Sequence, residues 1–199
     1  MTEKKITLEE VSTQIKQMLK RAIHDKKDPL NTMTLTTLGT EYPESRAVIL
    51  RKFKEDTLIC HSDRRTEKVQ QIRNNPAISW HGWHPRRRVQ LRLSGKAKAH
   101  VSGGLFEEEW ARIQGSSRLN YSAITIPGTK VESAKEGWNN FGGIEDAQNH
   151  LISDAWKSHF CVIETEILKI DWLQLERGKN RRAIFHKVKG QWEGIWVVP

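Results

Sequence analysis

The sequence predicts a mainly β protein, a small β-barrel with peripheral helices on its outside. Segments typical of strands follow one another along most of the chain, separated only by turns and short helical stretches. No internal repeat and no low-complexity linker divides the 199 residues. Consecutive strands interrupted by short helices are typical of small barrels, so we expect a single domain over residues 1–199.

The composition is that of a soluble globular protein, with 37% hydrophobic and 29% charged residues. No apolar run approaches the roughly 20 residues of a membrane-spanning helix. The first ten residues, MTEKKITLEE, lack the apolar core of a signal peptide. We therefore expect a cytoplasmic protein without a membrane partner. The net charge of +9 suits nucleic acid, a membrane surface or phosphorylated small molecules, and does not choose between them.

The first element is an amphipathic helix at 7–24, within an N-terminal segment 1–27 that we expect to pack on the barrel. Thr7 and Glu10 match a capping box, and apolar residues follow at helical spacing. Asp28-Pro29 ends the helix. The period then changes to the alternation typical of strands, which we expect at 31–40, 45–53 and 56–62.

The middle and end of the chain continue this arrangement. A short helix at 66–75 ends before Pro76, and a strand at 77–83 leads to a long alternating strand at 86–101. Further helical and strand segments are expected at 103–115, 159–175, 181–188 and 191–198. The last two strands form a hairpin around Lys189-Gly190. Residues 133–159 are predicted as an insertion, a polar loop followed by a short helix near 145–157.

Motifs for several kinds of chemistry are absent from the sequence. GxSxG, GxGxxG, GxxxxGK[ST] and HExxH do not occur. Cys60 and Cys161 lie in strand-like apolar runs without metal-ligand spacing, so we expect buried free thiols and no metal site. The basic strand HPRRRVQLR carries no aromatic stacking pair beside its arginines, which argues against nucleic-acid binding.

SRAVILRKF, residues 45–53, places a cation at each end of an apolar strand. Arg46 and Arg51 are five residues apart, about 16 Å along one strand, and face opposite sides. They could therefore serve two phosphates but not clamp one. The apolar middle predicts barrel core. Other cations and polar groups near strand ends are Ser62, Lys68, Gln90 and Arg182; for each, plain surface placement is the alternative.

The order of these pieces resembles the pyridoxamine 5′-phosphate oxidase family, whose members have an FMN-binding split β-barrel. The resemblance covers residues 28–102 through SRAVILRKF, CHSDRRTEKVQQIRNNP and WHPRRRVQLRLSGKAK, and resumes with IDWLQL and RRAIF. It implies FMN as cofactor and a homodimer with FMN at the subunit interface. It also implies a small substrate that carries a phosphate.

The resemblance implies a role for each matching residue. It places Arg46 near the FMN phosphate, His61 and Ser62 against the phosphate or ribityl chain, and Lys68 on the phosphate. Gln90 and Arg182 would reach the flavin, and Pro127 and Gly128 would lie where the partner subunit closes over it. The strand beside the flavin comprises Ala47, Val48, Ile49, Leu50 and Arg51. Substrate binding falls to Arg51, Trp110 and Ser117.

Three positions depart from the family pattern. Glu67 replaces an arginine that binds the FMN phosphate, so we expect Glu67 to turn away and Arg64 or Arg65 to compensate. Leu173, beside Trp172, stands where a flavin-stacking tryptophan is expected. The segment GKNRRAIF lacks the substrate histidine of the family's R-x-H-D-R pattern. FMN binding is therefore better supported than oxidation of pyridoxamine phosphate.

The sequence therefore predicts an FMN-dependent oxidoreductase with an unassigned substrate and no dedicated catalytic side chain, because the flavin itself accepts the hydride. One alternative is a genuine pyridoxamine/pyridoxine 5′-phosphate oxidase that makes pyridoxal 5′-phosphate. Another is a non-catalytic flavin, haem or nucleic-acid binder on the same barrel.

Overall fold

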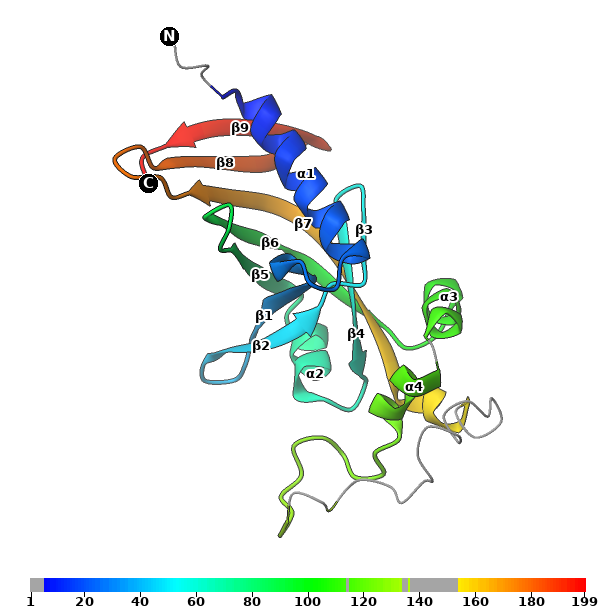
Figure 1. Cartoon of the computed structure of the whole chain (residues 1–199). Coiled ribbons are helices and arrows are strands. Elements are labelled where there is room, and N and C mark those ends of the chain that lie inside the picture. The colour runs from blue at the N-terminus through cyan, green and yellow to red at the C-terminus, as the bar shows by residue number, and fades with distance from the viewer. Residues whose placement is uncertain (1–5, 114, 134–135, 137–153) are drawn as a thin grey trace. The chain divides into compact units, whose positions relative to one another are not determined.

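The computed structural model describes residues 6–113, 115–133, 136 and 154–199 and shows a mainly β fold with peripheral helices (Figure 1). The helices are α1 (Leu8–His24), α2 (Glu67–Asn74), α3 (Gly104–Arg112) and α4 (Gly115–Arg118), with 3-10 turns η1 (Pro29–Asn31), η2 (Leu119–Tyr121) and η3 (Trp156–His159). The strands are β1 (Thr32–Leu38), β2 (Pro43–Ile49), β3 (Lys52–Lys54), β4 (Thr57–Asp63), β5 (Ala77–His84), β6 (Val89–His100), β7 (Phe160–Gln174), β8 (Arg181–Val188) and β9 (Gln191–Val197).

The chain divides into two compact units. The first unit comprises Met1–Cys60, Pro76–Ala97 and Thr165–Pro199, and the second comprises His61–Asn75 and Lys98–Glu164. Strands β4, β6 and β7 have residues in both. The first unit holds α1 and most of the sheet, and the second holds α2, α3 and α4. The expectation of a single domain stays a prediction.

The strands of the described residues form one sheet in the order β2-β1-β5-β6-β7-β4-β3, with β8 paired to β7 and β9 to β8. Strands β2 and β3 stand at opposite ends of this order, yet only Leu50 and Arg51 connect them along the chain. Because consecutive Cα atoms are about 3.8 Å apart, so short a link brings the two end strands together. The sheet must therefore curl.

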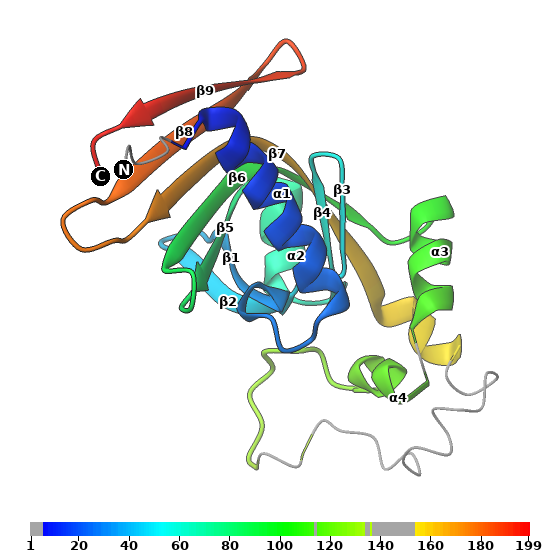
Figure 2. The ribbon, with the colours of Figure 1, turned by 45° about the horizontal axis from the view of Figure 1, so that its top comes forward.

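Helix α1 forms as the sequence predicts. The Thr7 hydroxyl accepts from the Glu10 N–H, and the Glu10 carboxylate accepts from the Thr7 N–H. One face is buried, namely Val11, Ile15, Met18, Leu19 and Ala22. Helix α1 packs on β3, β9 and η1 (Figures 1 and 2). None of the described helices is long and apolar enough to cross a membrane.

The prediction of one continuous strand at 45–53 is wrong. Strand β2 ends at Ile49 and β3 begins at Lys52. Between them, the Leu50 N–H donates to the Asn31 carbonyl and the Arg51 N–H to the Ile59 carbonyl, both at 2.8 Å. The chain thus changes partner strand at this point, and the spacing of 16 Å along one strand does not apply.

Within the apolar middle of this segment, the prediction of barrel core holds for Leu50 and is wrong for Ala47 and Ile49. Leu50 is 1% exposed, but Ile49 is 43% exposed and Ala47 is exposed too. The reason is that β2 is an end strand of the sheet and pairs only with β1. Besides Leu50, the buried core of the first unit includes Leu35, Trp80 and Leu91.

Other boundaries differ by a few residues. The long strand begins at Val89 because the preceding residues turn, with Arg88 at φ 53°. The helix expected at 103–115 is shorter, as α3 ends at Arg112. Most of the helix expected near 145–157 lies outside the described residues. The terminal hairpin is confirmed, with Val188 paired to Gln191 around a two-residue turn at positive φ.

A close approach of β6 and β7 generates a testable prediction. A Cβ on Gly95 would lie 1.8 Å from the Glu166 carbonyl oxygen. Gly95→Ala should therefore lower the free energy of unfolding by about 3 kcal/mol, at the upper end of overpacking costs. Urea denaturation followed by tryptophan fluorescence measures this. Gly104→Ala is the control, since nothing lies within 4 Å of its added Cβ; equal stability of both variants would contradict the close approach.

Candidate functional site

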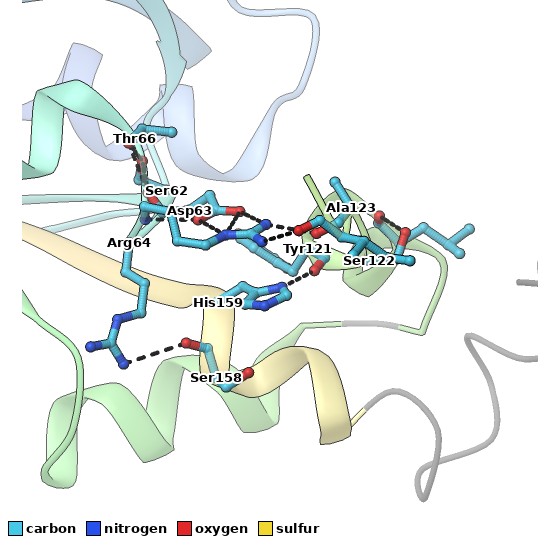
Figure 3. A network of polar contacts seen from close by, with 12 residues as sticks. Ser62, Asp63, Arg64, Thr66, Tyr121, Ser122, Ala123, Ser158 and His159 are labelled. Carbon is cyan, nitrogen blue, oxygen red and sulfur yellow. Dashed lines mark hydrogen bonds and ion pairs between the residues drawn. The ribbon is translucent and has the colours of Figure 1, made fainter. Parts of the chain in front are cut away.

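In the second unit, a cation and two hydroxyls converge at the start of α2. The Lys68 ammonium donates to Ser62 Oγ at 3.1 Å and to Thr66 Oγ1 at 3.2 Å, and the two hydroxyls lie 3.2 Å apart. Ser62 is 7% exposed and Lys68 is half-buried. Ser62 is the next-to-last residue of β4, and its side chain points toward Thr66 (Figure 3). We call Ser62, Thr66 and Lys68 the hydroxyl–lysine cluster.

The local turn explains why this cluster forms. The Asp63 carboxylate accepts from the Arg65 N–H at 2.8 Å, which tightens the chain between β4 and α2. Thr66 is the N-cap of α2, but its hydroxyl does not cap the helix and donates to the Asp63 carbonyl at 2.7 Å instead. A helix N-terminus favours anions. With an ammonium and two hydroxyls beside it, the donor set fits a phosphate.

Arg65 is committed to internal contacts. Its guanidinium pairs with the Asp63 carboxylate at 2.7 Å and donates to the carbonyls of Ala123, at 2.8 Å, and Ile124, at 3.1 Å. Arg64 is exposed and donates to the Ser158 carbonyl at 3.4 Å. Of the two arginines expected to compensate for Glu67, Arg64 is thus the accessible one. Glu67 itself is exposed on α2.

His61 and Ser62 point to opposite faces of β4, as neighbours on a strand do. The His61 ring lies 3.0 Å from the Glu109 carboxylate and edge-on to Phe160, with ring centroids 5.0 Å apart. Both His61 and Glu109 have side chains less than 10% exposed. The structure therefore places His61 in the packing of the second unit and not beside the hydroxyls, and its cofactor role stays a prediction.

Trp110 also lies in the packed interior of the second unit. It is 3% exposed, its indole N–H donates to the Asp154 carboxylate at 3.1 Å, and the Arg118 guanidinium stacks 4.6 Å from the ring centroid. Ser117 is half-buried on α4. The contacts of Trp110 do not point to a substrate, and the substrate-binding roles of Trp110 and Ser117 stay predictions.

Pro127, which is half-buried, and Gly128, which is exposed, form a turn. The Thr129 N–H donates to the Ile126 carbonyl at 3.1 Å, and Gly128 has φ +92°. Proline followed by a residue at positive φ is typical of a type II turn. Ile124 and Ile126, just before it, are 71% and 57% exposed. This loop therefore presents apolar side chains on its surface.

Cys60 and Cys161 are free and buried, as predicted. Burial raises the pKa of the Cys161 thiol to about 11, although Arg73, Arg64 and Lys68 oppose that shift. The thiol is therefore protonated at neutral pH, which makes it a poor nucleophile.

In the first unit, Arg46 and Arg51 differ in how they are held. The Arg46 guanidinium pairs with the Glu44 carboxylate at 3.1 Å and donates to the Thr37 hydroxyl and the Glu44 carbonyl. Arg51 is exposed, and within the described residues its side chain has no hydrogen-bond or ion-pair partner. Arg46 is thus fixed and partly neutralised, whereas Arg51 keeps its full charge.

A second polar cluster joins three neighbouring strands. The Asp171 carboxylate on β7 receives the Arg182 guanidinium from β8, through Nε at 3.1 Å and Nη2 at 2.8 Å. Arg92 on β6 pairs with the same carboxylate. Burial raises the pKa of Asp171, but hydrogen bonds from Arg182 and Arg92 outweigh this and lower it below the usual value. We call these residues the arginine–aspartate triad.

Gln90 and Leu173 share the sheet face of this triad. Gln90 is two residues from Arg92 on β6, and Leu173 lies directly across from Arg182 in the β7–β8 register. Within the described residues, the Gln90 side-chain amide has no hydrogen-bond partner. Trp172 points to the other face and is fully buried, so it does not replace the stacking tryptophan expected at Leu173.

Sequence reasoning missed three of these residues. Thr66 was expected only as the first residue of the helix at 66–75, whereas its hydroxyl lies against Ser62 and Lys68. Asp171 and Arg92 had no assigned role, although an acidic residue inside the apolar run ILKIDWL was a signal. Their contact could not be inferred, because 79 residues separate them.

Comparisons with known proteins agree with this fold. Residues 12–101 match the family model described as pyridoxamine 5′-phosphate oxidase, FMN-binding domain. The pyridoxine/pyridoxamine 5′-phosphate oxidase of Legionella pneumophila (strain Lens) is 27% identical over 136 residues, which are 66% of this chain and 57% of that protein. The alignment thus spans a little over half the length of that curated relative.

Two solved structures are similar over nearly the whole chain. A pyridoxamine 5′-phosphate oxidase-related, FMN binding protein from Nostoc punctiforme has a TM-score of 0.71 at 19% identity, covering 98% of this chain and 100% of its own. PhzG from Burkholderia lata, in complex with tetrahydrophenazine-1-carboxylic acid, has a TM-score of 0.70 at 12% identity, covering 95% and 92%. At these identities the likeness shows the fold.

The predicted split β-barrel and the predicted family resemblance are both confirmed. The predicted cofactor is confirmed as well, since the matched family model is an FMN-binding domain. Residues 12–101 thus match the FMN-binding domain of the pyridoxamine 5′-phosphate oxidase family, and the chain has the mainly β split-barrel fold of the similar solved structures.

Proposed function

We propose that this protein is an FMN-dependent oxidoreductase and that the hydroxyl–lysine cluster binds the FMN phosphate. The observation that carries this proposal is the contact of the Lys68 ammonium with the Ser62 and Thr66 hydroxyls. This contact lies at the N-terminus of α2, where the Thr66 hydroxyl makes no capping hydrogen bond to the helix. A bound flavin supplies the hydride-accepting chemistry. The chain's own residues bind and orient it.

The position of Lys68 supports an anionic ligand. An ammonium in the first turn of a helix lies at the positive end of the helix dipole, where cations are disfavoured. Lys68 is nevertheless held there by two hydroxyls. A phosphate would relieve this repulsion and could accept hydrogen bonds from the ammonium and, after rotation, from both hydroxyls.

In the first unit, the family resemblance assigns Gln90 and Arg182 to the flavin and Arg46 to its phosphate. The Gln90 amide, without a partner among the described residues, is suited to bond a ligand. Arg46 already pairs with Glu44. We therefore assign Arg46 a smaller share of the phosphate's binding energy than Lys68.

For the substrate we propose a chemical class and not a single compound. The exposed Arg51 side chain, which has no ion pair within the described ranges, supports a small substrate with an anionic group. The Legionella relative's name favours pyridoxine or pyridoxamine 5′-phosphate as a second candidate. GKNRRAIF, which lacks the family's substrate histidine, argues against it. Oxygen uptake and pyridoxal 5′-phosphate formation with these two substrates decide between the proposals.

We also propose a cytoplasmic homodimer. Two buried free cysteines fit a reducing compartment. The exposed side chains of Ile124 and Ile126 are apolar surface that a second copy of the chain could bury. The family resemblance places the adjoining Pro127 and Gly128 where a partner subunit closes over FMN.

Substitution of the basic residues should separate cofactor binding from substrate binding. Lys68→Ala should weaken FMN binding by about 10- to 100-fold, the scale of a hydrogen bond to a charged group. Arg46→Ala should cause a smaller loss, and Arg51→Ala should leave FMN affinity unchanged while raising KM for an anionic substrate. Quenching of FMN fluorescence on titration with apoprotein measures the affinity.

The control for these variants is Arg73→Ala. It removes an exposed cation from the other end of α2 and should not change FMN affinity. Equal losses in the Lys68, Arg46 and Arg51 variants would refute the division of roles. Wild-type protein that is colourless and rejects added FMN would refute the proposed function and favour a different ligand on the same barrel.

Substitution of the exposed loop tests the homodimer. Ile124→Asp with Ile126→Asp should shift the protein from dimer toward monomer, because a charge at a buried apolar contact is unfavourable. Sedimentation velocity at micromolar concentrations measures the oligomeric state. Val198→Asp, at another exposed apolar residue (88% exposed), is the control. A monomeric wild type, or an unchanged dimer in the double variant, would contradict this assignment.

A further inference from the structure

Asp171 is a buried carboxylate whose role neither the sequence nor the family pattern assigned. We propose that Asp171 is a positioning residue: it orients the Arg182 guanidinium so that one edge contacts the flavin. This inference rests on the proposed function, because it takes FMN as the ligand of the sheet face that carries the arginine–aspartate triad. It adds a residue that acts on the flavin through another side chain.

The geometry of the pair fixes which atoms Arg182 can offer. Its Nε and Nη2 both donate to Asp171, to Oδ1 at 3.1 Å and to Oδ2 at 2.8 Å. This side-on pairing locks the plane of the guanidinium. Nη1 remains, and among the described residues nothing accepts a hydrogen bond from it. Asp171 thus leaves one donor edge of Arg182 open.

Asp171 also keeps two cations on one small surface. Arg92 pairs with the same Oδ2 atom as Arg182. Without the carboxylate, the two guanidiniums would repel each other and take other rotamers. The Asp171 side chain is 5% exposed, whereas those of Arg182 and Arg92 are 27% and 46% exposed. The two arginines therefore cover the carboxylate, and the net positive charge of the triad faces outward.

The surroundings of the triad are those of a ligand-facing surface. Gln90, with an amide that has no partner within the described ranges, lies on the same face of β6 as Arg92. Leu173 lies across from Arg182 and adds an apolar side chain. Donors beside an apolar residue suit the polar edge and the flat face of a flavin ring. Surface charge alone would not require so buried a carboxylate.

The pKa of Asp171 supports a permanent charge at this position. The carboxyl's pKa is held below its usual value by Arg182 and Arg92 despite burial, and the pKa of Arg182 is raised by its hydrogen bond to Asp171. The pair is therefore ionised throughout the neutral range. Its orienting effect does not depend on a titration near neutral pH.

A double-mutant cycle on FMN affinity tests this role. The variants are Asp171→Asn, Arg182→Ala and both together, titrated with FMN as apoproteins and followed by flavin fluorescence. Each single variant should weaken FMN binding by about tenfold, the scale of one charge-assisted hydrogen bond. The double variant should bind no more than about twofold more weakly than Arg182→Ala, because Asp171 acts through Arg182.

Two further variants keep the test independent of folding and of net charge. Asp171→Glu keeps the charge but moves the carboxylate by one methylene, and it should show an intermediate loss of affinity. Glu176→Gln is the matched control, because it removes the exposed partner of the neighbouring Arg181, paired at 3.0 Å, and should leave affinity unchanged. Thermal unfolding of each apoprotein shows that the titrations use folded protein.

The outcomes separate the two proposals. If wild-type protein does not bind FMN, the proposed function fails. If wild-type protein binds FMN and Asp171→Asn binds it equally or more tightly, the positioning role is overturned, since added positive charge alone would favour an anionic ligand. Additive losses in the double variant would likewise overturn it, because they would mean that Asp171 acts independently of Arg182.

Discussion

The link of Leu50 and Arg51 is the constraint on which the barrel depends. These two residues join the strands at opposite ends of the sheet order, and each donates its N–H to a different neighbour, Asn31 or Ile59. The chain thereby leaves one end of the sheet and enters the other without a crossover. Leu50 is 1% exposed, so the position at which the chain passes from β2 to β3 is anchored in the core.

Local patterns predicted the elements well and their pairing poorly. The capping box, the alternating strands and the terminal hairpin depend on residues close in sequence, so their signals are visible there. The prediction of one continuous strand for SRAVILRKF failed for the opposite reason. Its apolar run looks like one strand, but the break at Leu50 depends on hydrogen-bond partners near residues 31 and 59. Periodicity contains no information about such partners.

The same distinction applies to the candidate site. The family resemblance supplied residue types at matching positions, and these include the Ser62 and Lys68 pair that the structure brings together. It could not show that the His61 ring pairs with Glu109, 48 residues away, or that Arg182 is held by Asp171. Internal contacts decide which cations remain available, and such contacts are long-range. Arg51 stays open, whereas Arg65 does not.

Arg65 connects the proposed phosphate site to the loop that we propose as the contact with a second copy of the chain. Its guanidinium connects Asp63, in the turn that shapes the hydroxyl–lysine cluster, to the carbonyls of Ala123 and Ile124 at the start of the exposed apolar loop. In the proposed FMN complex, a phosphate that orders the turn would also restrict that loop through Arg65. By thermodynamic linkage, any factor by which a bound phosphate strengthens contacts of the loop is the factor by which those contacts strengthen phosphate binding. In the proposed FMN-bound homodimer, this one side chain would therefore link cofactor occupancy to subunit association.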